Sequence, residues 1–227
     1  SLNRLVIKME TYGEGFESLS EENQLIIKDF DTVHQSVLDL ADDSEEFKQI
    51  SDKNGMKIYT KANPDGGKYV KAEGVFDFPA SLVADYASDS EIRLEVDKTF
   101  KEAKIIEEIG CGLGYEYSRM KGTFIVSDRD FCTVRHRKDE DTGRIIISAY
   151  SKEHPDCPLS KAVRGEMRIF GYVITPNAED EEKCYAQLIM SANLCGSIPT
   201  MFANKAVEAN GKFLHKLNKK LKADAAE

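Results

Sequence analysis

Long apolar runs, an excess of basic charge and a regular cysteine pattern are all missing from this sequence. No run of about 18 apolar residues occurs, so the sequence predicts no membrane-spanning helix. The net charge of −9 argues against nucleic acid as the main partner, because a phosphate backbone requires a basic face. The five cysteines are an odd count with wide, irregular spacing, which favours reduced thiols over a disulfide framework. The first residues contain no apolar core of a signal peptide, so we expect a cytoplasmic protein.

The composition is that of a globular domain with a substantial core. Hydrophobic residues make up 41% and charged residues 31% of the 227 residues, which are ordinary values for a soluble protein. We expect residues 1–45 to form an N-terminal helical extension packed on a single domain of residues 46–227. In the extension, apolar residues recur at the spacing of three or four that predicts a helix: Ile26, Phe30, Val33, Val37 and Leu40.

After this helix the pattern changes to the alternating runs typical of antiparallel strands. Asn54-Gly55 between two such runs is a strong hairpin signal. We expect about nine strands and, between the third and fourth, two short helices, the first of which begins near Pro79. The expected strands are 47–50, 56–60, 69–78, 100–109, 113–121, 130–137, 144–151, 163–175 and 183–193.

A long amphipathic helix from about Ser197 to Lys222 is the last predicted element. Pro199 suits its first turn. A long helix after a curved antiparallel sheet predicts an α+β protein with a helix-grip architecture, in which the sheet wraps and the helix covers its open side. The apolar face of this helix consists of Ile198, Phe202, Ala206, Ala209, Phe213, Leu217 and Leu221.

Two neighbouring predicted strands carry opposite charges that could face one interior. Alternation along a strand places Glu116 on one face of the first, and places Phe131, Thr133 and Arg135 together on one face of the second. A paired charge is tolerated in an apolar shell and can orient a polar group that enters. The alternative is a cross-strand pair at the surface, which contributes roughly a few tenths of a kcal/mol.

The run Ser127-Asp128-Arg129-Asp130-Phe131, with Val134-Arg135 after it, resembles the core signature of the START domain, the steroidogenic-acute-regulatory-related lipid-transfer domain. The resemblance covers roughly residues 47–221. It implies a helix-grip fold around a lipid tunnel. It also implies that Glu116 and Arg135 form the charged pair inside that tunnel.

Within the family, the resemblance is nearest to the phosphatidylcholine-transfer branch. An Arg and an Asp four residues later engage the phosphate and its surroundings in that branch, and Arg93 and Asp97 match these positions; the alternative is a helical surface pair. Phe131 keeps one of the branch's aromatic positions. Arg168 occupies another, where it suits an anionic or strongly polar head group if it lies in the tunnel; the alternative is an outward residue of an alternating strand. Val96 stands where a Trp usually precedes the Asp, so the sequence leaves choline recognition open.

An apolar loop between the two charged strands contains Phe124 and Ile125. Exposed apolar runs usually mark an interaction surface, although ordinary loop packing is the alternative. The resemblance implies that this loop is the gate and membrane contact of the tunnel, together with Ile198, Met201 and Phe202. The last helix also has a basic face that suits an anionic membrane or a solvated helix end: Lys205, Lys212, Lys216, Lys219, Lys220 and Lys222.

These features predict a lipid carrier rather than an enzyme. We expect a monomer that holds one lipid, a phospholipid or alternatively a sterol or ceramide, carries it between membranes and contacts membrane surfaces transiently. No metal or cofactor is expected, because His154 and Cys157 lack a second ligand pair. The first alternative is a cyclase or hydrolase on the same scaffold that acts on an apolar substrate, with Glu116 and either Tyr115 or His136 as acid and base. The second is a sensor that binds lipid to regulate a partner.

Overall fold

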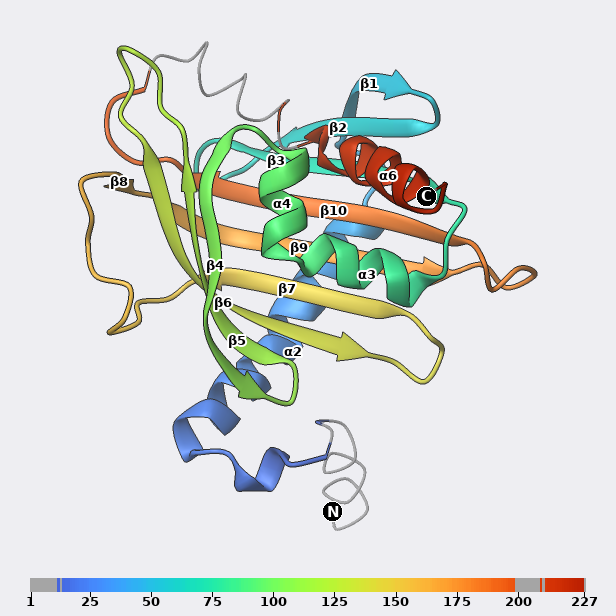
Figure 1. Ribbon diagram of the computed structural model, residues 1–227, viewed down its shortest axis with the longest axis horizontal. Coiled ribbons are helices and arrows are strands. Elements are labelled where there is room, and N and C mark those ends of the chain that lie inside the picture. The colour runs from blue at the N-terminus through green and yellow to red at the C-terminus, as the bar shows by residue number, and fades with distance from the viewer. Residues whose placement is uncertain (1–11, 13, 199–208, 210, 227) are drawn as a thin grey trace.

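Helix α2 (Glu21–Asp42) is the first long element of the computed structural model, which describes residues 12, 14–198, 209 and 211–226 (Figure 1). A single 3-10 turn, η1 (Phe16–Ser18), precedes it. The hydroxyl of Ser20 caps the helix by accepting the backbone N–H of Asn23 at 3.3 Å, as serine does at this position. The predicted apolar stripe is confirmed for its fully buried members, which are Ile26, Phe30 and Val37.

The described strands form one curved sheet whose order is β1-β2-β3-β10-β9-β7-β6-β5-β4, with β8 beside β6 (Figure 1). All pairs are antiparallel except β6 with β8. The strands are β1 (Lys48–Lys53), β2 (Met56–Ala62), β3 (Lys68–Phe76), β4 (Phe100–Gly110), β5 (Leu113–Met120), β6 (Arg129–Asp139), β7 (Ile145–Ser151), β8 (Val163–Arg164), β9 (Glu166–Pro176) and β10 (Cys184–Asn193).

The sheet has ten described strands where the sequence predicts about nine, because the run 163–175 divides at Gly165. The two residues before Gly165 pair in parallel with the start of β6. The residues after it pair with β7 and β10. Gly165 has no room for a side chain, since a Cβ there would lie 2.4 Å from Cε1 of Phe131. A change of pairing partner is a tertiary event, so the continuous alternation of the run could not reveal it.

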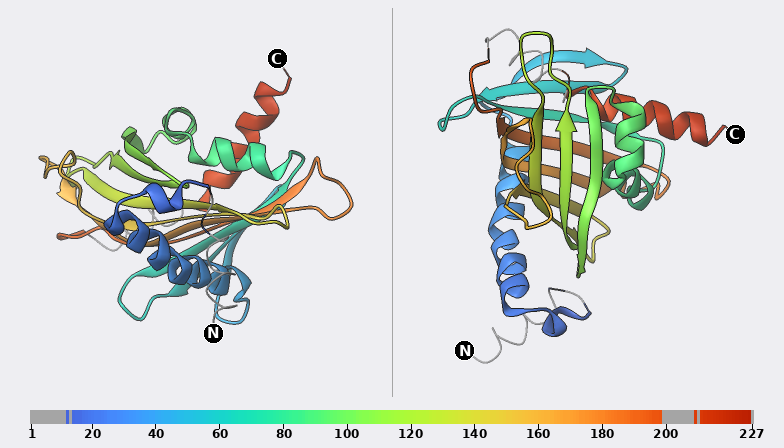
Figure 2. Two further views of the ribbon diagram at one scale, coloured as in Figure 1. Left: turned by 90° about the horizontal axis from the view of Figure 1, so that it is seen from below. Right: turned by 60° about the vertical axis from the view of Figure 1, so that its left-hand side comes forward.

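Helices cover both faces of the sheet (Figure 2). Helices α3 (Ala80–Ser88) and α6 (Phe213–Asp224) pack on one face, where they share a core with residues of β2, β3, β9 and β10. Helix α4 (Ser90–Val96) follows α3 and packs against β4. Helix α2 packs on the opposite face, against β7, β9 and β10. Alternating side chains of one strand therefore serve two cores: Tyr172 and Ile174 face α3 and α6, and Val173 faces α2.

The described part of the predicted last helix is α6. Its apolar face is as predicted, with Phe213, Leu217 and Leu221 buried. Residues 199–208, where the sequence predicts the first turns, lie outside the described part of the chain. No helix among the described residues is long and apolar enough to cross a bilayer.

A cavity between the sheet and helices α3 and α4

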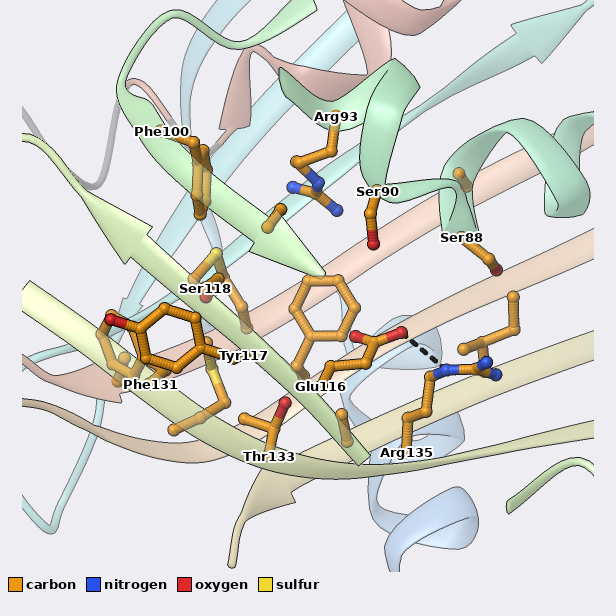
Figure 3. A pocket seen from close by; sticks show the side chains of 18 of the residues that line it. Ser88, Ser90, Arg93, Phe100, Glu116, Tyr117, Ser118, Phe131, Thr133 and Arg135 are labelled. Carbon is orange, nitrogen blue, oxygen red and sulfur yellow. Dashed lines mark ion pairs between the residues drawn. The ribbon is translucent and has the colours of Figure 1, made fainter. Parts of the chain in front are cut away.

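A cavity of about 1060 Å³, including the part open to solvent, lies between the sheet and the α3–α4 segment. Most of its lining surface is apolar. Its polar groups come from the α3–α4 junction and from the middle of β5 and β6 (Figure 3). The apolar wall includes Phe100, Phe131, Ile147, Phe170 and Leu188.

Glu116 and Arg135 face each other inside this cavity (Figure 3). Nε of Arg135 lies 2.6 Å from Oε1 of Glu116. The strand register explains the contact, because Glu116 pairs with Thr133 and Gly114 pairs with Arg135. Glu108 on β4 also pairs with Arg135. The lack of a side chain at Gly114 lets Glu108 reach Arg135, since a Cβ at Gly114 would lie 3.0 Å from Oε2 of Glu108.

The Glu116 carboxylate is held in a poorly hydrated place. Burial raises its pKa, and the positive charges of Arg135 and Arg93 partly offset that rise. The accessible fraction is 29% for the Glu116 side chain and 13% for that of Arg135. Both residues line the cavity, so a ligand would meet a partly dehydrated ion pair that can accept and donate hydrogen bonds.

Arg93 enters the cavity from α4. Its Nη2 donates to the hydroxyl of Tyr172 at 2.7 Å, and its guanidinium carbon lies 3.8 Å from the ring centroid of Phe213. None of the described carboxylates forms an ion pair with Arg93. Burial raises the pKa of Tyr172 to about 12, so this tyrosine is a neutral acceptor and does not neutralise the positive charge of Arg93.

Asp97, unlike Arg93, does not face the cavity. It is 1% exposed and is not among the described residues that line the cavity. Its Oδ1 accepts Nζ of Lys216 at 2.9 Å and the hydroxyl of Thr99 at 2.8 Å. The expectation that Asp97 contacts lipid therefore has no support from its position, because its carboxylate joins the end of α4 to α6 instead.

Phe131 lines the cavity, whereas Arg168 does not. The reason is an irregularity in the pairing of β9 with β10: Ser191 pairs with Ile169, but the next residue, Ala192, pairs with Met167. Arg168 is thus the extra residue of a β-bulge, and a bulge changes which side chains face inward. Nη1 of Arg168 donates to the carbonyl of Gly66 at 2.6 Å. Arg168 therefore points away from the cavity, as the alternative interpretation of the sequence had it, and Met167 lines the cavity in its place.

The signature run fixes the surroundings of Phe131. Asp128 accepts hydrogen bonds from Lys101, Arg119 and the backbone of Gly122. Arg129 donates to the carbonyls of Ser127, Leu194 and Cys195, which ties β6 to the segment after β10. Asp130 is fully buried and pairs with Arg164 at 2.8 Å. Charged residues that follow one another in sequence therefore brace three separate segments around one wall of the cavity.

The loop between β5 and β6 has exposed apolar residues. Phe124 is fully exposed and Ile125 is 68% exposed. Ile198 is half-buried, and Met201 and Phe202 lie outside the described residues. The basic face of the last helix is partly neutralised within the protein, through ion pairs of Lys216 with Asp97, Lys220 with Glu95 and Asp224, and Lys222 with Asp77.

Several lining residues were missed by sequence reasoning. Ser88, Asp89 and Ser90 form the α3–α4 junction above the cavity, and no sequence pattern indicates which side of such a junction faces inward. Phe170 and Tyr172 were accessible to reasoning, because they share one strand face with spacing of two. Alternation counted backwards along β9 from Ile174 places Tyr172 and Phe170 on the same inward face.

Comparison with known sequences gives relatives that span the domain. The family model of the START domain matches residues 29–222. The mitochondrial steroidogenic acute regulatory protein of Danio rerio is 27% identical over 196 residues, which cover 84% of this chain and 68% of that protein. Its counterpart in Salvelinus fontinalis is 28% identical, with coverage of 78% and 63%. The chain thus spans about two thirds of the length of these relatives.

Solved structures show the same fold. Human StAR-related lipid transfer protein 5 superposes with a TM-score of 0.77 at 22% identity, covering 86% of this chain and 95% of that one. Human STARD10 gives 0.71 at 21% identity, with coverage of 82% and 77%. The predicted helix-grip fold is confirmed. Because the family match extends over most of the sequence, the chain belongs to the START-domain family.

Proposed function

We propose that this protein binds one lipid in the cavity and carries it between membranes. The observation that supports this most is the mostly apolar hollow that contains an ion pair, Glu116 with Arg135, and a third charge, Arg93. Close packing is normal in a protein interior. A mostly apolar hollow with charged groups in its wall suits a molecule that has a long apolar part and a polar end.

The proposed mechanism is physical rather than chemical. Transfer of an acyl or ring carbon from water into the cavity contributes about 0.8 kcal/mol per CH₂. The polar end of the lipid meets the ion pair and Arg93. Binding therefore depends on apolar area for affinity and on a few fixed polar groups for orientation, as in most small-molecule sites.

We propose a phospholipid as the first choice of ligand. The remaining N–H groups of Arg93 form a planar fork that suits phosphate oxygens, and Phe213 and Phe100 hold the guanidinium on its apolar side. A sterol or ceramide would offer hydroxyl oxygens to the same groups. The relatives named above are called steroidogenic acute regulatory proteins, so a sterol is the principal alternative.

We expect part of the cavity wall to move when a lipid enters, as lids do at other binding sites. We propose that the loop 121–128 and the last helix act as this gate at the membrane. Phe124 and Ile125 supply the apolar contact. From the sequence, we include three further residues in this gate and membrane contact: Ile198, Met201 and Phe202.

The enzyme alternative would require an acid–base pair at the cavity. Glu116 is there, but neither Tyr115 nor His136 is among the described residues that line it. His136 lies on the opposite face of the sheet, where it bonds to His34. Turnover of an added apolar substrate, lost in Glu116→Ala, would favour an enzyme over a carrier.

Native mass spectrometry of the purified protein tests the proposal and identifies the ligand class. We expect one co-purifying lipid per chain and transfer of a fluorescent lipid between vesicles. Arg135→Leu should lower transfer severalfold. Arg137→Leu is the matched control, because Arg137 lies two residues further along β6 and forms ion pairs with Asp85 and Asp139 outside the cavity lining. Unchanged transfer by a folded Arg135→Leu variant would remove Arg135 from the site, and a protein that neither holds nor transfers lipid would contradict the proposal.

A further inference from the structure

The three most exposed large apolar side chains in the described part of the chain lie on two loops at one end of the sheet. They are Phe124 at 104%, Leu159 at 79% and Ile125 at 68%. Leu159 belongs to the loop 152–162 that joins β7 to β8, and both loops leave the same end of the molecule (Figure 1). Exposed apolar groups gathered in this way mark a contact surface.

The strand register brings the two loops together. The loop 152–162 leaves the sheet where the backbone N–H of Lys152 donates to the carbonyl of Cys132. It returns where the N–H of Val163 donates to the carbonyl of Asp128. Asp128 is also the last residue of the loop 121–128, so the second loop ends at the base of the first.

The exposure of Leu159 is imposed by its neighbours. The carbonyl of Pro158 accepts Nη2 of Arg164 at 3.2 Å. On the other side, the hydroxyl of Ser160 donates to Oδ2 of Asp130 at 2.7 Å. Both residues next to Leu159 are therefore fixed to the buried Arg164–Asp130 pair, and the leucine side chain projects outward between them.

The tip of the other loop is braced in a similar way. Oδ1 of Asp128 accepts the backbone N–H of Gly122 at 2.8 Å, and Thr123 and Val126 pair across the turn. Phe124 and Ile125 form the tip between these two residues. Two acids of the signature run, Asp128 and Asp130, which are separated by Arg129, thus hold one apolar tip each.

Charge favours one orientation of this end toward an anionic surface. Lys121 and Lys161 are exposed, and neither has an ion-pair partner among the described residues. The same loops also carry Lys152 and two further acids, Glu153 and Asp156. Asp128 is paired with Lys101 and Arg119, so with these two partners the basic groups at this end outnumber the acids five to three. The two turns at the opposite end of the sheet, 139–144 and 177–183, carry seven carboxylates against two basic residues. An anionic surface therefore favours the first end over the second.

We propose that the loops 121–128 and 152–162 form one docking surface for an anionic lipid bilayer, with Leu159 as an anchor separate from the Phe124–Ile125 tip. This proposal deepens the carrier function and rests on it for its purpose. It fixes the orientation of the docked protein, with the acidic turns pointing away from the membrane. Each inserted side chain gains by leaving water, and each lysine gains from anionic head groups.

The absence of tryptophan from the chain allows a direct test of insertion. Leu159→Trp introduces a single tryptophan at the proposed anchor, and Leu25→Trp places one at a leucine of α2 that is 61% exposed. With vesicles of phosphatidylcholine and phosphatidylserine, emission from position 159 should move to shorter wavelength and be quenched by brominated acyl chains. Emission from position 25 should stay unchanged. If position 159 shows neither response while Phe124→Trp shows both, Leu159 is not an anchor and the proposal fails.

A charge placed at the anchor gives an independent measure. Leu159→Asp should lower the partition coefficient on the same vesicles about tenfold, the loss expected when one large apolar contact is removed. Leu25→Asp adds the same charge elsewhere and should bind as the wild type does. Equal binding of both variants would overturn the proposal.

The lysines have a separate test. Lys161→Glu should weaken binding to vesicles with phosphatidylserine severalfold and have little effect on vesicles of phosphatidylcholine alone. Lys53→Glu, at an exposed lysine of β1, is the control. An equal loss for both variants would show that net charge alone, and not this end of the sheet, is responsible.

Uptake of detergent-dispersed lipid by the wild type, without vesicles, separates this proposal from the carrier function. If the wild type takes up no lipid but the tryptophan of Leu159→Trp inserts into vesicles, the carrier function is contradicted and the docking surface stands. If the wild type takes up lipid but the tryptophan of Leu159→Trp stays in water, the docking surface is contradicted and the carrier function stands.

Discussion

Nε2 of His34 on α2 lies 2.8 Å from Nδ1 of His136 on β6, and both side chains are almost fully buried. Nδ1 of His34 lies 2.8 Å from the hydroxyl of Ser148 on β7, and His136 also bonds to the backbone of Cys111. A neutral imidazole has one donor and one acceptor. Ser148 can then donate to His34, His34 to His136, and His136 to the Cys111 carbonyl, so with both rings neutral this chain of bonds holds α2 on the sheet. With both rings protonated, the two facing nitrogens would both be donors and the bond between them would be lost.

The first prediction concerns acid stability. Burial, with a smaller contribution from the charge of Lys138, lowers the pKa of His34 to about 3 and that of His136 to about 4. Both values lie below the unfolded value of about 6.5, so the unfolded state binds more protons in acid. The contribution of each ring to the free energy of unfolding is complete above about pH 6.5 and falls by about 1.4 kcal/mol per pH unit below it. Urea unfolding at a series of pH values measures this slope.

The double variant His34→Gln/His136→Asn is the control for this slope. It removes both titrating rings and keeps polar groups in the gap. The variant should be less stable near neutral pH and should lose less stability between about pH 6.5 and 5. A slope equal to that of the wild type would show that other groups cause the acid sensitivity.

The second prediction separates stability from function at Glu116. Its pKa in the folded state is raised, so its contribution to stability is present below the unfolded pKa and is lost as the pH rises through the folded value. Glu116→Gln resembles the protonated carboxyl and should raise the free energy of unfolding at neutral pH by about 1 kcal/mol. Lipid uptake should fall in the same variant. A less stable Glu116→Gln protein would mean that the ion pair with Arg135 outweighs the cost of burial.

The third prediction concerns Asp97 and Lys216, which join α4 to α6 at 2.9 Å. If the pair acts as this joint, Asp97→Asn and Lys216→Met should each destabilise the fold, and the double variant should cost less than their sum. A coupling energy of about 0.5–3 kcal/mol is expected for contacting residues in one network. Denaturant unfolding of the four proteins of the cycle provides the measurement. Additive losses would rule out a coupled joint.

The fourth prediction uses two glycines on opposite faces of the sheet. A Cβ on Gly165 would lie 2.4 Å from the ring of Phe131 and push it toward the cavity, and a Cβ on Gly171 would lie 2.5 Å from Val37 of α2. Both alanine variants should lose about 1–3 kcal/mol of stability through overpacking. Only Gly165→Ala should lower lipid uptake severalfold in a binding titration. Equal uptake by the two variants would place Phe131 outside the lipid site.

Strand alternation and helical spacing were enough to predict most of the fold. The apolar stripe of α2, the hairpin at Asn54-Gly55 and the buried face of α6 each depend on local periodicity, which is a property of the chain itself. The same alternation predicted that Glu116 and Arg135 could share one interior, because their strands are joined by a short loop. These features need only neighbours in sequence.

Tertiary structure alone decided the details that depend on distant segments. A bulge in β9 against β10 turned Arg168 outward and Met167 inward. Lys216 of α6 forms an ion pair with Asp97, whereas Arg93, one helical turn earlier, faces the cavity. The chain alone predicted which residues carry charge and which strands they occupy. Packing between elements far apart in sequence decided which charged side chain has an ion-pair partner and which faces the cavity. The reason is that a buried charge is stabilised only by the groups that the fold brings within reach.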